Sequence, residues 1–279
     1  MADDKKKESS AFSSINRPTA GAREQKDLPA GEHPIQLYSL ATPNGIKVTT
    51  LLIELGLAFD AYKINIMKGE QFWSGFVDIN PNSKIPALVD KNGPNGQSVN
   101  VFESGNILLY LAEKTGRFIP SDPVKRVECL NWLFHQMGAG PYFGQFGHFY
   151  KYANEKIPYA IDRYTMETQR LLSVLDQALE GKEWLVGDEL TIADFAWIPW
   201  VRCIETGYNA KEHVGLDNYK NVAAWCDRWL ARPAVAEGLK INAWAPDAYA
   251  NYHTDGTTSI KVTNEELAKK KEEEAAEQK

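Results

Sequence analysis

The stretch INPNSKIPALVDKNGPNGQSVNVFESGNILLYLAEKTG, residues 79–116, decides the fold of this chain. Its segment IPALV (85–89) predicts a strand with a proline at its head. The turn residues of KNGPNGQS (91–98) predict a hairpin that returns as VNVF (99–102). The following ESGNILLYLAEKTG (103–116) has apolar residues at helical spacing and a closing glycine, which is typical of a helix C-terminus.

The residues before this unit predict two more strands and two more helices. IQLYSL (35–40) predicts a short apolar strand, IKVTTLLIELG (46–56) a helix, and AFDAYKINI (58–66) an alternating strand. A weak helix is predicted between this last strand and residue 79. The resulting order, βαβαββα over residues 34–117, is that of a thioredoxin-like domain.

From about residue 124 the chain has helical patterns throughout, and the string GAGP (138–141) is expected to bend or break the first helix. We therefore predict an α/β plus all-α protein, with the thioredoxin-like domain followed by an all-helical domain over 124–245. Four segments carry apolar residues at helical spacing: VKRVECLNWLFHQMG (124–138), IPYAIDRYTMETQRLLSVLDQALEG (157–181), LTIADFAWIPWVRCIE (190–205) and YKNVAAWCDRWLARPAV (219–235).

Both ends of the chain are polar. Residues 1–33 predict an extended or partly disordered arm, in which Phe12, Ile15 and Pro18 are suited to docking on a folded surface. Residues 246–279 end in NEELAKKKEEEAAEQK and are expected to form a charged tail, either solvated or loosely helical.

The composition excludes several classes of protein. A net charge of -6 and a sequence pI of about 5.5 argue against a nucleic-acid partner. No apolar stretch approaches the ~20 residues that cross a membrane, and the start MADDKKKESS lacks the apolar run of a secretory signal. Three scattered cysteines, Cys129, Cys203 and Cys226, fit a reducing compartment rather than a disulfide framework or a zinc site. We expect a cytoplasmic protein without a membrane partner.

The turn TPNG (42–45) lies where the first strand meets the first helix. Asn44 suits a helix N-cap, and a helix N-terminus stabilises an anion such as a thiolate. Thr42 and Asn44 also carry a hydroxyl and an amide that donate hydrogen bonds to sulfur. Plain capping uses the same residue types, so both interpretations stay open.

Two further places suit a peptide with charged ends. A cis bond between Ile85 and Pro86 would present the backbone of Ile85 to an extended peptide, whereas a trans proline at a strand edge would be structural only. Ser104 is expected to cap the third helix, whose free N–H groups suit a carboxylate, and Glu103 is suited to accept from an ammonium. A γ-glutamyl group carries both charges, and a simple helix cap is the alternative.

Two motifs in the helical region are interpreted structurally or left open. Thr191 and Asp194 predict a capping box that fixes a buried helix. An aromatic cluster suits either a cleft between the domains or ordinary core packing, and its histidines lack neighbours at metal spacing, so no metal is expected. The members of the cluster are Trp132, His135, Phe143, Phe146, His148 and Phe149.

The succession TPNG, NPNSKIPALVD, FESGNILLYLAEKTG and LTIADFAWIPW resembles the glutathione transferases at every step. The segments NWLFHQMG, GHFY, IPYAIDRYTMETQRLL and FSSINRP are similar to the nu-class, YghU-like group, which is related to the fungal nitrogen-catabolite regulator. The resemblance covers roughly residues 10–245. It implies a homodimer with glutathione lying across the first domain.

The resemblance also assigns individual positions. The family's contacts with glutathione fall on Thr42 and Asn44 at the thiol, Ile85 before the cis-proline Pro86, Glu103 and Ser104 at the γ-glutamyl group, Gln71 and Lys84 at the glycyl end or backbone, and Arg163 from the helical domain.

For activity, the resemblance implies glutathione-dependent reduction of small disulfides by thiol–disulfide exchange. This group holds two thiols or a disulfide in one site, so two glutathiones supply the sulfurs and no protein cysteine is needed. Two alternatives stay open: a conjugating transferase or peroxidase acting on electrophiles or hydroperoxides, and a non-enzymatic regulator with the same fold. The arm lacks the Asn/Gln-rich bias expected of such a regulator.

Overall fold

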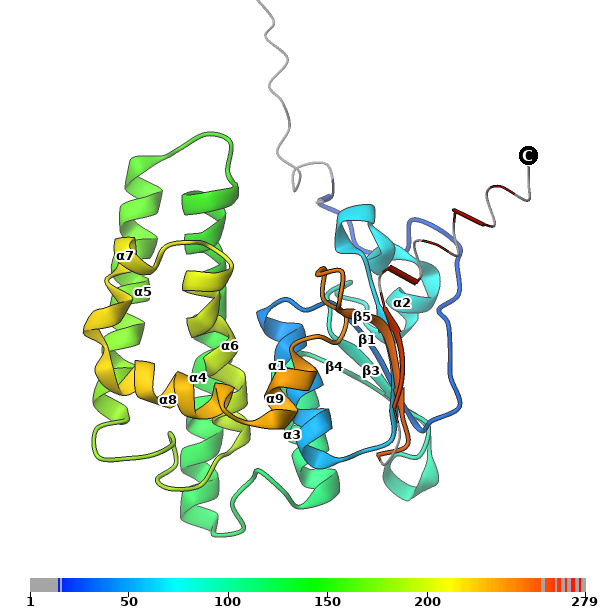
Figure 1. Ribbon diagram of the computed structural model, residues 1–279, viewed down its shortest axis with the longest axis horizontal. Helices are drawn as coiled ribbons and strands as arrows, with labels where there is room; N and C mark the ends of the chain where they lie inside the picture. The colour runs from blue at the N-terminus through cyan, green and yellow to red at the C-terminus, as the bar shows by residue number, and fades with distance from the viewer. Residues whose placement is uncertain are drawn as a thin grey trace, which may run out of the picture.

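The computed structural model describes residues 15, 17–256 and 259–263, together with residues 265, 266, 269, 272, 273 and 276. Phe12 of the predicted docking patch and most of NEELAKKKEEEAAEQK lie outside the described residues. Figure 1 shows two parts side by side, a sheet flanked by helices and a helical bundle.

The first part confirms the predicted order of strands and helices. Strand β1 pairs in parallel with β2 and antiparallel with β3, and β3 pairs antiparallel with β4. The elements are β1 (Ile35–Ser39), α1 (Pro43–Leu55), β2 (Phe59–Lys63), α2 (Ser74–Ile79), β3 (Ala87–Asp90), β4 (Val99–Phe102) and α3 (Ser104–Thr115), with short 3-10 turns η1 (Ile66–Lys68), η2 (Glu70–Phe72) and η3 (Pro94–Gly96).

The start of α1 differs from the prediction. The N-cap is Thr42, whose Oγ1 accepts from the N–H of Gly45 at 3.4 Å, so the expectation that Asn44 caps this helix was wrong. Pro43 is the first helical residue, because its fixed φ suits the first turn and it has no N–H to satisfy. The Asn44 side chain is therefore free for other contacts. Gly56 ends the helix at φ 65°, a left-handed conformation that glycine adopts readily.

The second part is helical, as predicted, and it follows α3 in the chain. Its elements are α4 (Pro123–Gly147), the π-helical turn η4 (His148–Tyr152), α5 (Pro158–Ala178), α6 (Ile192–Thr206), α7 (Lys211–Val214), the 3-10 turn η5 (Leu216–Asn218), α8 (Lys220–Leu230) and α9 (Pro233–Gly238).

Helix α4 runs through GAGP without a break. Pro141 lies inside the helix, which continues to Gly147, so a break at this string was a wrong prediction. A Cβ atom at Gly140 would lie 3.5 Å from Trp200 Nε1, and one at Gly144 would lie 3.4 Å from the Trp200 ring. Both distances are ordinary van der Waals contacts, and α4 packs along α6. That packing maintains the helix although Pro141 removes one backbone hydrogen bond.

The stretch 246–279 is not only a charged tail, which corrects a second prediction. Strands β5 (Tyr249–Thr254) and β6 (Ser259–Thr263) form a hairpin, and β5 pairs antiparallel with β2. The sheet therefore has the order β4-β3-β1-β2-β5-β6. Alternate side chains of β5 are buried, and the Tyr252 ring stacks on Phe59 at 5.4 Å. The charged residues that follow conceal this period-2 pattern in the sequence.

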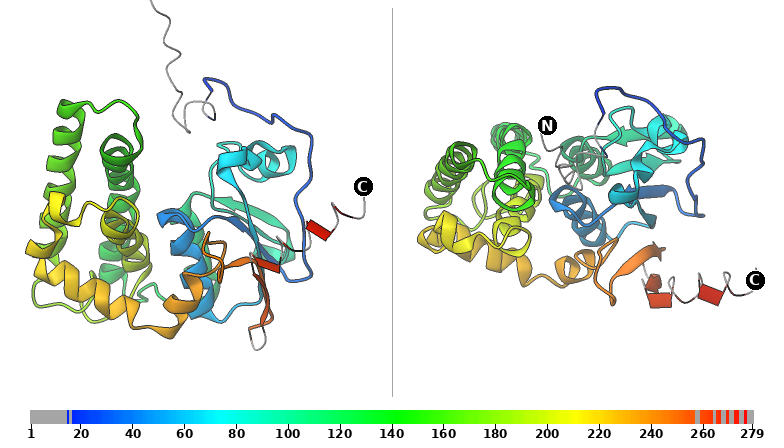
Figure 2. Two further views of the ribbon diagram at one scale, coloured as in Figure 1. Left: turned by 45° about the horizontal axis from the view of Figure 1, so that its top comes forward. Right: turned by 90° about the horizontal axis from the view of Figure 1, so that it is seen from above.

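Helices α1 and α3 cover the face of the sheet that is turned toward the helical part, and α2 covers the other face (Figures 1 and 2). Helix α1 packs against α6 and α9, and α3 packs against α4 and α6. The N-terminus of α1 thus lies at the junction of the two parts, and a site built there draws residues from both.

Residues 17–33 form an extended arm along η2 and α2 (Figure 2). The backbone N–H of Arg23 donates to the carbonyl of Phe72 at 2.8 Å, and the Arg23 guanidinium lies 3.4 Å from the centre of the Phe72 ring. The Lys26 ammonium lies 3.8 Å from the centre of the Trp73 ring. Cation–π contacts of this kind, together with backbone hydrogen bonds, fix the arm on the first part.

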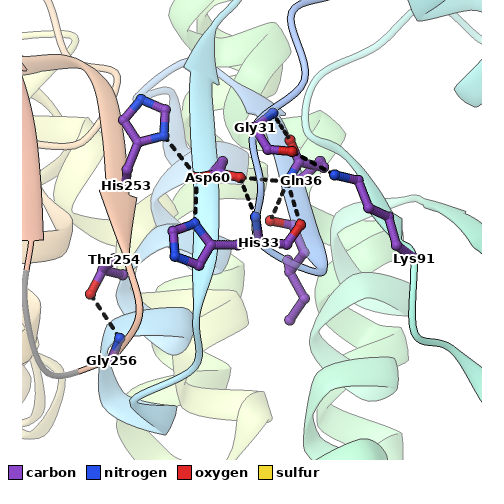
Figure 3. A network of polar contacts seen from close by, with 9 residues as sticks. Gly31, His33, Gln36, Asp60, Lys91, His253, Thr254 and Gly256 are labelled. Atoms are coloured by element: carbon purple, nitrogen blue, oxygen red, sulfur yellow. Dashed lines mark hydrogen bonds and ion pairs between the residues drawn. The ribbon is translucent and has the colours of Figure 1, made fainter.

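Asp60 on β2 joins the two ends of the folded chain (Figure 3). Its carboxylate accepts from the N–H and Nδ1 of His33 at 2.9 and 2.6 Å, from Gln36 Nε2 at 2.6 Å and from His253 Nδ1 at 2.7 Å. Burial alone would raise the pKa of Asp60, but the hydrogen bonds from His33, Gln36 and His253 outweigh it and lower that pKa to about 2. An ionised Asp60 therefore ties both the arm and the β5–β6 hairpin to the sheet.

Candidate active site

A cavity of about 300 Å³ lies at the N-terminus of α1, between the two parts of the molecule. The arm, the β1–α1 turn, η1, η2, the loop before β3 and α6 all contribute to its wall. Of the predicted site residues, the wall contains Thr42, Asn44, Gln71, Lys84 and Ile85. The other lining residues are Ile15, Pro43, Ile66, Ser83 and Trp200.

The orientation of the Asn44 amide is set by a tryptophan from the helical part. Trp200 Nε1 donates to Asn44 Oδ1 at 2.9 Å, and the Ser104 hydroxyl lies 3.5 Å from the same oxygen. An indole N–H only donates, so the Asn44 oxygen must face Trp200 and the amide NH₂ must be at the other end. Asn44 therefore has donors for a group in the cavity. Thr42 accepts the capping bond through Oγ1, which leaves its hydroxyl hydrogen to donate.

The peptide bond between Ile85 and Pro86 is cis, which decides a question that the residues alone left open. Ile85 lines the cavity. Within the described part of the chain, no backbone group hydrogen-bonds to the N–H or C=O of Ile85. These two groups are thus available to pair with an extended peptide, as one more short strand.

Glu103 and Ser104 take different places from those expected. Glu103, not Ser104, occupies the N-cap position of α3, at φ 68° and without a side-chain capping bond. The prediction that Ser104 caps α3 was therefore wrong, because Ser104 is already the first helical residue. With no side-chain cap, the first N–H groups of α3 remain available to an anion.

The side chains of these two residues also diverge. Ser104 is buried, and its hydroxyl accepts from Lys47 Nζ at 3.2 Å and lies beside Asn44. Glu103 is exposed and lines a neighbouring apolar groove with Leu133 and Phe134. Ser104 is thus directly linked to the cavity wall, whereas Glu103 lines the neighbouring groove.

Arg163 is not brought to the cavity. It lies on an outward face of α5, where its guanidinium is 3.9 Å from the carboxylate of Glu167 one turn later. Its side chain is 44% exposed. The helical periodicity of IPYAIDRYTMETQRLL places this position on the polar side of the helix.

The aromatic cluster mainly serves packing. Phe143 and Phe146 are fully buried, and the His135 ring makes an edge contact with Trp197 at 5.0 Å between ring centres. Phe149 stacks on Tyr164 at 5.6 Å. None of the six predicted cluster residues lines the cavity. The core-packing interpretation of this cluster is therefore the better supported one.

The capping box of α6 is confirmed. Asp194 accepts from the N–H of Thr191 at 2.8 Å, and both halves of the box are present. The same carboxylate accepts from the N–H of Leu185 and from Trp225 Nε1, each at 2.9 Å. Burial nevertheless raises the pKa of Asp194 to about 6, against the effect of these hydrogen bonds. This network fixes the helix that carries Trp200.

The cysteines lie away from the cavity wall. Burial raises the pKa of the Cys129 thiol, and it raises the pKa of Cys203 to about 11 and that of Cys226 to about 12. All three thiols therefore stay protonated near neutral pH. A thiol without its thiolate form is a poor nucleophile.

The hydrogen bonds around Asn44 and Ser104 include three residues that were not predicted as site residues. Trp200 belongs to a motif that was interpreted as purely structural, although it is the first partly exposed residue after the buried first half of α6. Lys47 is the one charged residue in the apolar run IKVTTLLI, and this isolation was the available signal. Gln136 reaches Lys47 only through the contact of α4 with α1, which spacing along the chain does not show.

Two further features are absent from the described residues. No helix among them is both long and apolar enough to span a membrane. No group of three or more His, Cys, Asp or Glu side chains in the same part of the chain is arranged to hold a metal ion.

A thioredoxin-like domain joined to a helical domain, with a cavity at the first helix N-terminus beside a cis-proline, defines a class of protein. Residues 33–113 match the glutathione S-transferase N-terminal domain, and residues 130–233 match the C-terminal domain. The chain is 52% identical over 241 residues to the disulfide-bond oxidoreductase YghU of Escherichia coli (strain K12), and the match covers 83% of each chain.

Solved structures agree with this assignment. Glutathione transferase YghU from Streptococcus pneumoniae, complexed with glutathione, is 49% identical with a TM-score of 0.81, over 88% of this chain and 97% of that one. A Pseudomonas putida glutathione transferase with one glutathione disulfide bound per subunit is 46% identical with a TM-score of 0.74, over 76% and 94%. The chain belongs to the glutathione transferase superfamily and, within it, to the YghU-like group.

Proposed function

We propose that this protein reduces small disulfides with glutathione by thiol–disulfide exchange. The observation that carries the proposal is the cavity at α1, where the Asn44 amide is held by Trp200 with its donors free and no cysteine is on the wall. The names and ligands of the similar proteins, a disulfide-bond oxidoreductase and structures with glutathione or its disulfide, support the same chemistry.

In the first step of the proposed reaction, one sulfur–sulfur bond forms while another breaks. The thiol of a bound glutathione loses its proton, assisted by donors from Asn44 and Thr42 and by the N-terminus of α1. The thiolate attacks a disulfide RSSR, so that a mixed disulfide forms and RS⁻ leaves with the bonding electron pair. The best attacking thiol has a pKa near ambient pH. Donors that lower the pKa of the glutathione thiol only moderately, as we propose for Asn44 and Thr42, therefore suit exchange.

In the second step, a second glutathione thiolate attacks the glutathione sulfur of the mixed disulfide. Oxidised glutathione forms and the second RS⁻ leaves, so two glutathiones are oxidised for each disulfide reduced. Both sulfurs of the product come from glutathione, in agreement with the protonated state of the three cysteines. Glutathione is thus a substrate, and the proposal requires no metal.

The other predicted residues receive proposed roles from their positions. We propose that Ile85 pairs with the peptide backbone, that Ser104 and the start of α3 bind the γ-glutamyl carboxylate, and that Glu103 binds its ammonium. For Gln71 and Lys84, which both line the cavity, we propose contacts with the glycyl carboxylate or the backbone. Arg163 has no support for such a role, because it lies at the surface beside Glu167.

We also propose a cytoplasmic homodimer. An apolar groove of about 320 Å³ lies between α3 and α4, and it is lined by Leu109, Leu133 and Met137. Phe134 also lines this groove, and it is 64% exposed. An aromatic side chain and an apolar groove on one face suit a self-complementary interface. Light scattering of the purified protein measures the mass, and a monomer at micromolar concentration would contradict this part of the proposal.

The test of the function is glutathione-dependent reduction of a hydroxyalkyl disulfide, coupled to glutathione reductase. We expect clear turnover for the wild type and a loss of about 10- to 100-fold in kcat/KM for Asn44→Ala, because one hydrogen bond to the thiolate is removed. Asn100→Ala is the matched control, since this exposed amide on β4 donates to the carbonyl of Asp78 and does not line the cavity. A variant with Cys129, Cys203 and Cys226 all replaced by Ala should keep its turnover.

The outcomes separate the alternatives. Wild-type protein that binds glutathione but does not reduce the disulfide would point to conjugation or to a regulatory role. Turnover that disappears in the cysteine-free variant, with the fold intact, would contradict exchange between two glutathiones.

A further inference from the structure

Lys47 is a fully buried lysine beside the cavity. It lies on α1 with 1% of its surface exposed. Its Nζ atom donates to Gln136 Oε1 on α4 at 2.6 Å and to the Ser104 hydroxyl on α3 at 3.2 Å. The side chain thus connects three helices from the two parts of the molecule, and one of its partners is a residue of the candidate site.

In the described part of the chain, Lys47 forms no ion pair. The opposing charge that acts on it is that of Glu103, which lies outside ion-pair distance at the start of α3. Burial lowers the pKa of Lys47 well below its usual range, and Glu103 offsets this only in part. A buried charge without a close partner is strongly disfavoured, so the free site favours the uncharged amine.

A position for an anion adjoins this amine. Ser104 is the first residue of α3, and no side chain caps the helix there. The first N–H groups of a helix attract a carboxylate, and the Ser104 hydroxyl links that position to Lys47. A carboxylate bound at Ser104 therefore supplies the close negative charge that the described residues do not.

We propose that Lys47 is a positioning residue of the glutathione site, which takes up one proton when the γ-glutamyl α-carboxylate binds at Ser104 and then holds that carboxylate as an ammonium. The proton comes from solvent, and the binding step converts a neutral amine and an anion into a buried ion pair. The inference rests on the proposed glutathione site. It adds that the affinity of this site is coupled to pH through a residue that touches no reacting sulfur.

The test counts the protons taken up when S-methylglutathione binds. The methyl group blocks the thiol, so proton release from sulfur does not contribute. Titration calorimetry at neutral pH in two buffers with different ionisation enthalpies gives the number of protons exchanged. We expect an uptake approaching one proton per site for the wild type, and none for Lys47→Met, with affinity weakened by about 10- to 100-fold, as for the loss of a charged hydrogen bond.

A matched control and a matched ligand distinguish this role from a structural one. Lys114→Met removes a lysine of α3 that is paired with Asp90, and it should leave the proton uptake unchanged. The S-methylated analogue with γ-aminobutyrate in place of the γ-glutamyl group lacks only the α-carboxylate, so the wild type should bind it without proton uptake. This comparison of two ligands needs no substitution and does not depend on the folding of Lys47→Met.

The results divide clearly. Binding of S-methylglutathione without proton uptake, or equal uptake in Lys47→Met, overturns the role of Lys47 and leaves the glutathione site standing. Equal uptake with the analogue overturns it as well. A complete absence of binding to the wild type overturns the glutathione site and this inference together. In turnover, Lys47→Met should raise KM for glutathione far more than it lowers kcat.

Discussion

A single indole hydrogen bond decides which end of the Asn44 amide faces the cavity. Trp200 comes from α6, in the helical part, and its Nε1 holds Asn44 Oδ1 at 2.9 Å. The chemistry of the N-terminus of α1 thus depends on a residue that lies 156 positions later in the chain. A thiolate at this place meets a donor that is already oriented, so little reorganisation is needed in the reaction.

Replacing Trp200 by Phe tests this dependence. The indole donor is lost while most of the aromatic surface remains, so the Asn44 amide is free to rotate. We expect kcat/KM for disulfide reduction to fall about tenfold, in line with one hydrogen bond. The measurement is the coupled assay described above, with Trp244→Phe as control, because Trp244 is half exposed and away from the cavity wall. Unchanged activity in Trp200→Phe would show that Asn44 does not need this bond.

Local motifs of the first domain, together with the family resemblance, pointed to one half of the cavity wall. Thr42, Asn44 and Ile85 lie in those motifs, the resemblance added Gln71 and Lys84, and all five residues line the cavity. The other half depends on contacts between helices far apart in sequence. Side-chain contacts of this kind are formed by packing and leave no spacing pattern.

At the scale of elements, the start of α6 shows how one buried carboxylate organises a helix. Asp194 accepts hydrogen bonds from Thr191 N–H and hydroxyl, Leu185 N–H and Trp225 Nε1. The motif LTIADF predicted the capping box from sequence, because this interaction is local. The continuous course of α4 through Pro141 was not predictable in the same way, because it depends on close packing against α6.

Asp194→Ala is expected to lower the free energy of unfolding by roughly 3 kcal/mol, because several buried donors lose their acceptor. Urea unfolding at pH 7 measures this, with Asp227→Ala as a control at an exposed position.

The contribution of Asp194 to the free energy of unfolding also changes with pH, and the sign of the change is defined. Because the folded pKa of about 6 lies above the unfolded value, the folded state binds the extra proton and Asp194 contributes less stability as pH rises from about 4 to 6. Asp194→Asn should remove this dependence of the free energy of unfolding on pH. If the dependence persists in the variant, another group causes it.

At the scale of the whole molecule, the sheet extends beyond the domain that the sequence predicts. The βαβαββα order was recognisable because each strand and helix has its own period. The β5–β6 hairpin was not, because its alternation is short and charged residues follow it. The hairpin is attached to β2 by backbone pairing of β5, and His253 on β5 also shares Asp60 with His33 (Figure 3).

Asp60→Asn is expected to destabilise the protein by about 2 kcal/mol or more at neutral pH, because the folded pKa of about 2 lies nearly two units below the usual value. This contribution is present above pH ~4 and is lost as pH falls toward 2. Urea unfolding measures the difference in the free energy of unfolding between wild type and variant, and this difference should be smaller at pH 3 than at pH 7. Asp78→Asn, at an exposed position, is the control. If the difference in the free energy of unfolding is as large at pH 3 as at pH 7, the charge of Asp60 is not its cause.

The place of the hairpin in the chain has a consequence for synthesis. The start of β5 at Tyr249 lies 186 positions after the end of β2 at Lys63. At about 5–20 residues per second, a ribosome needs roughly 10–40 s to cover that distance. Throughout this interval the emerging first domain carries β2 as an open sheet edge, a template for pairing with other chains. The hairpin that closes this edge is synthesised after the other four strands of the sheet, so protection by chaperones matters most before it arrives.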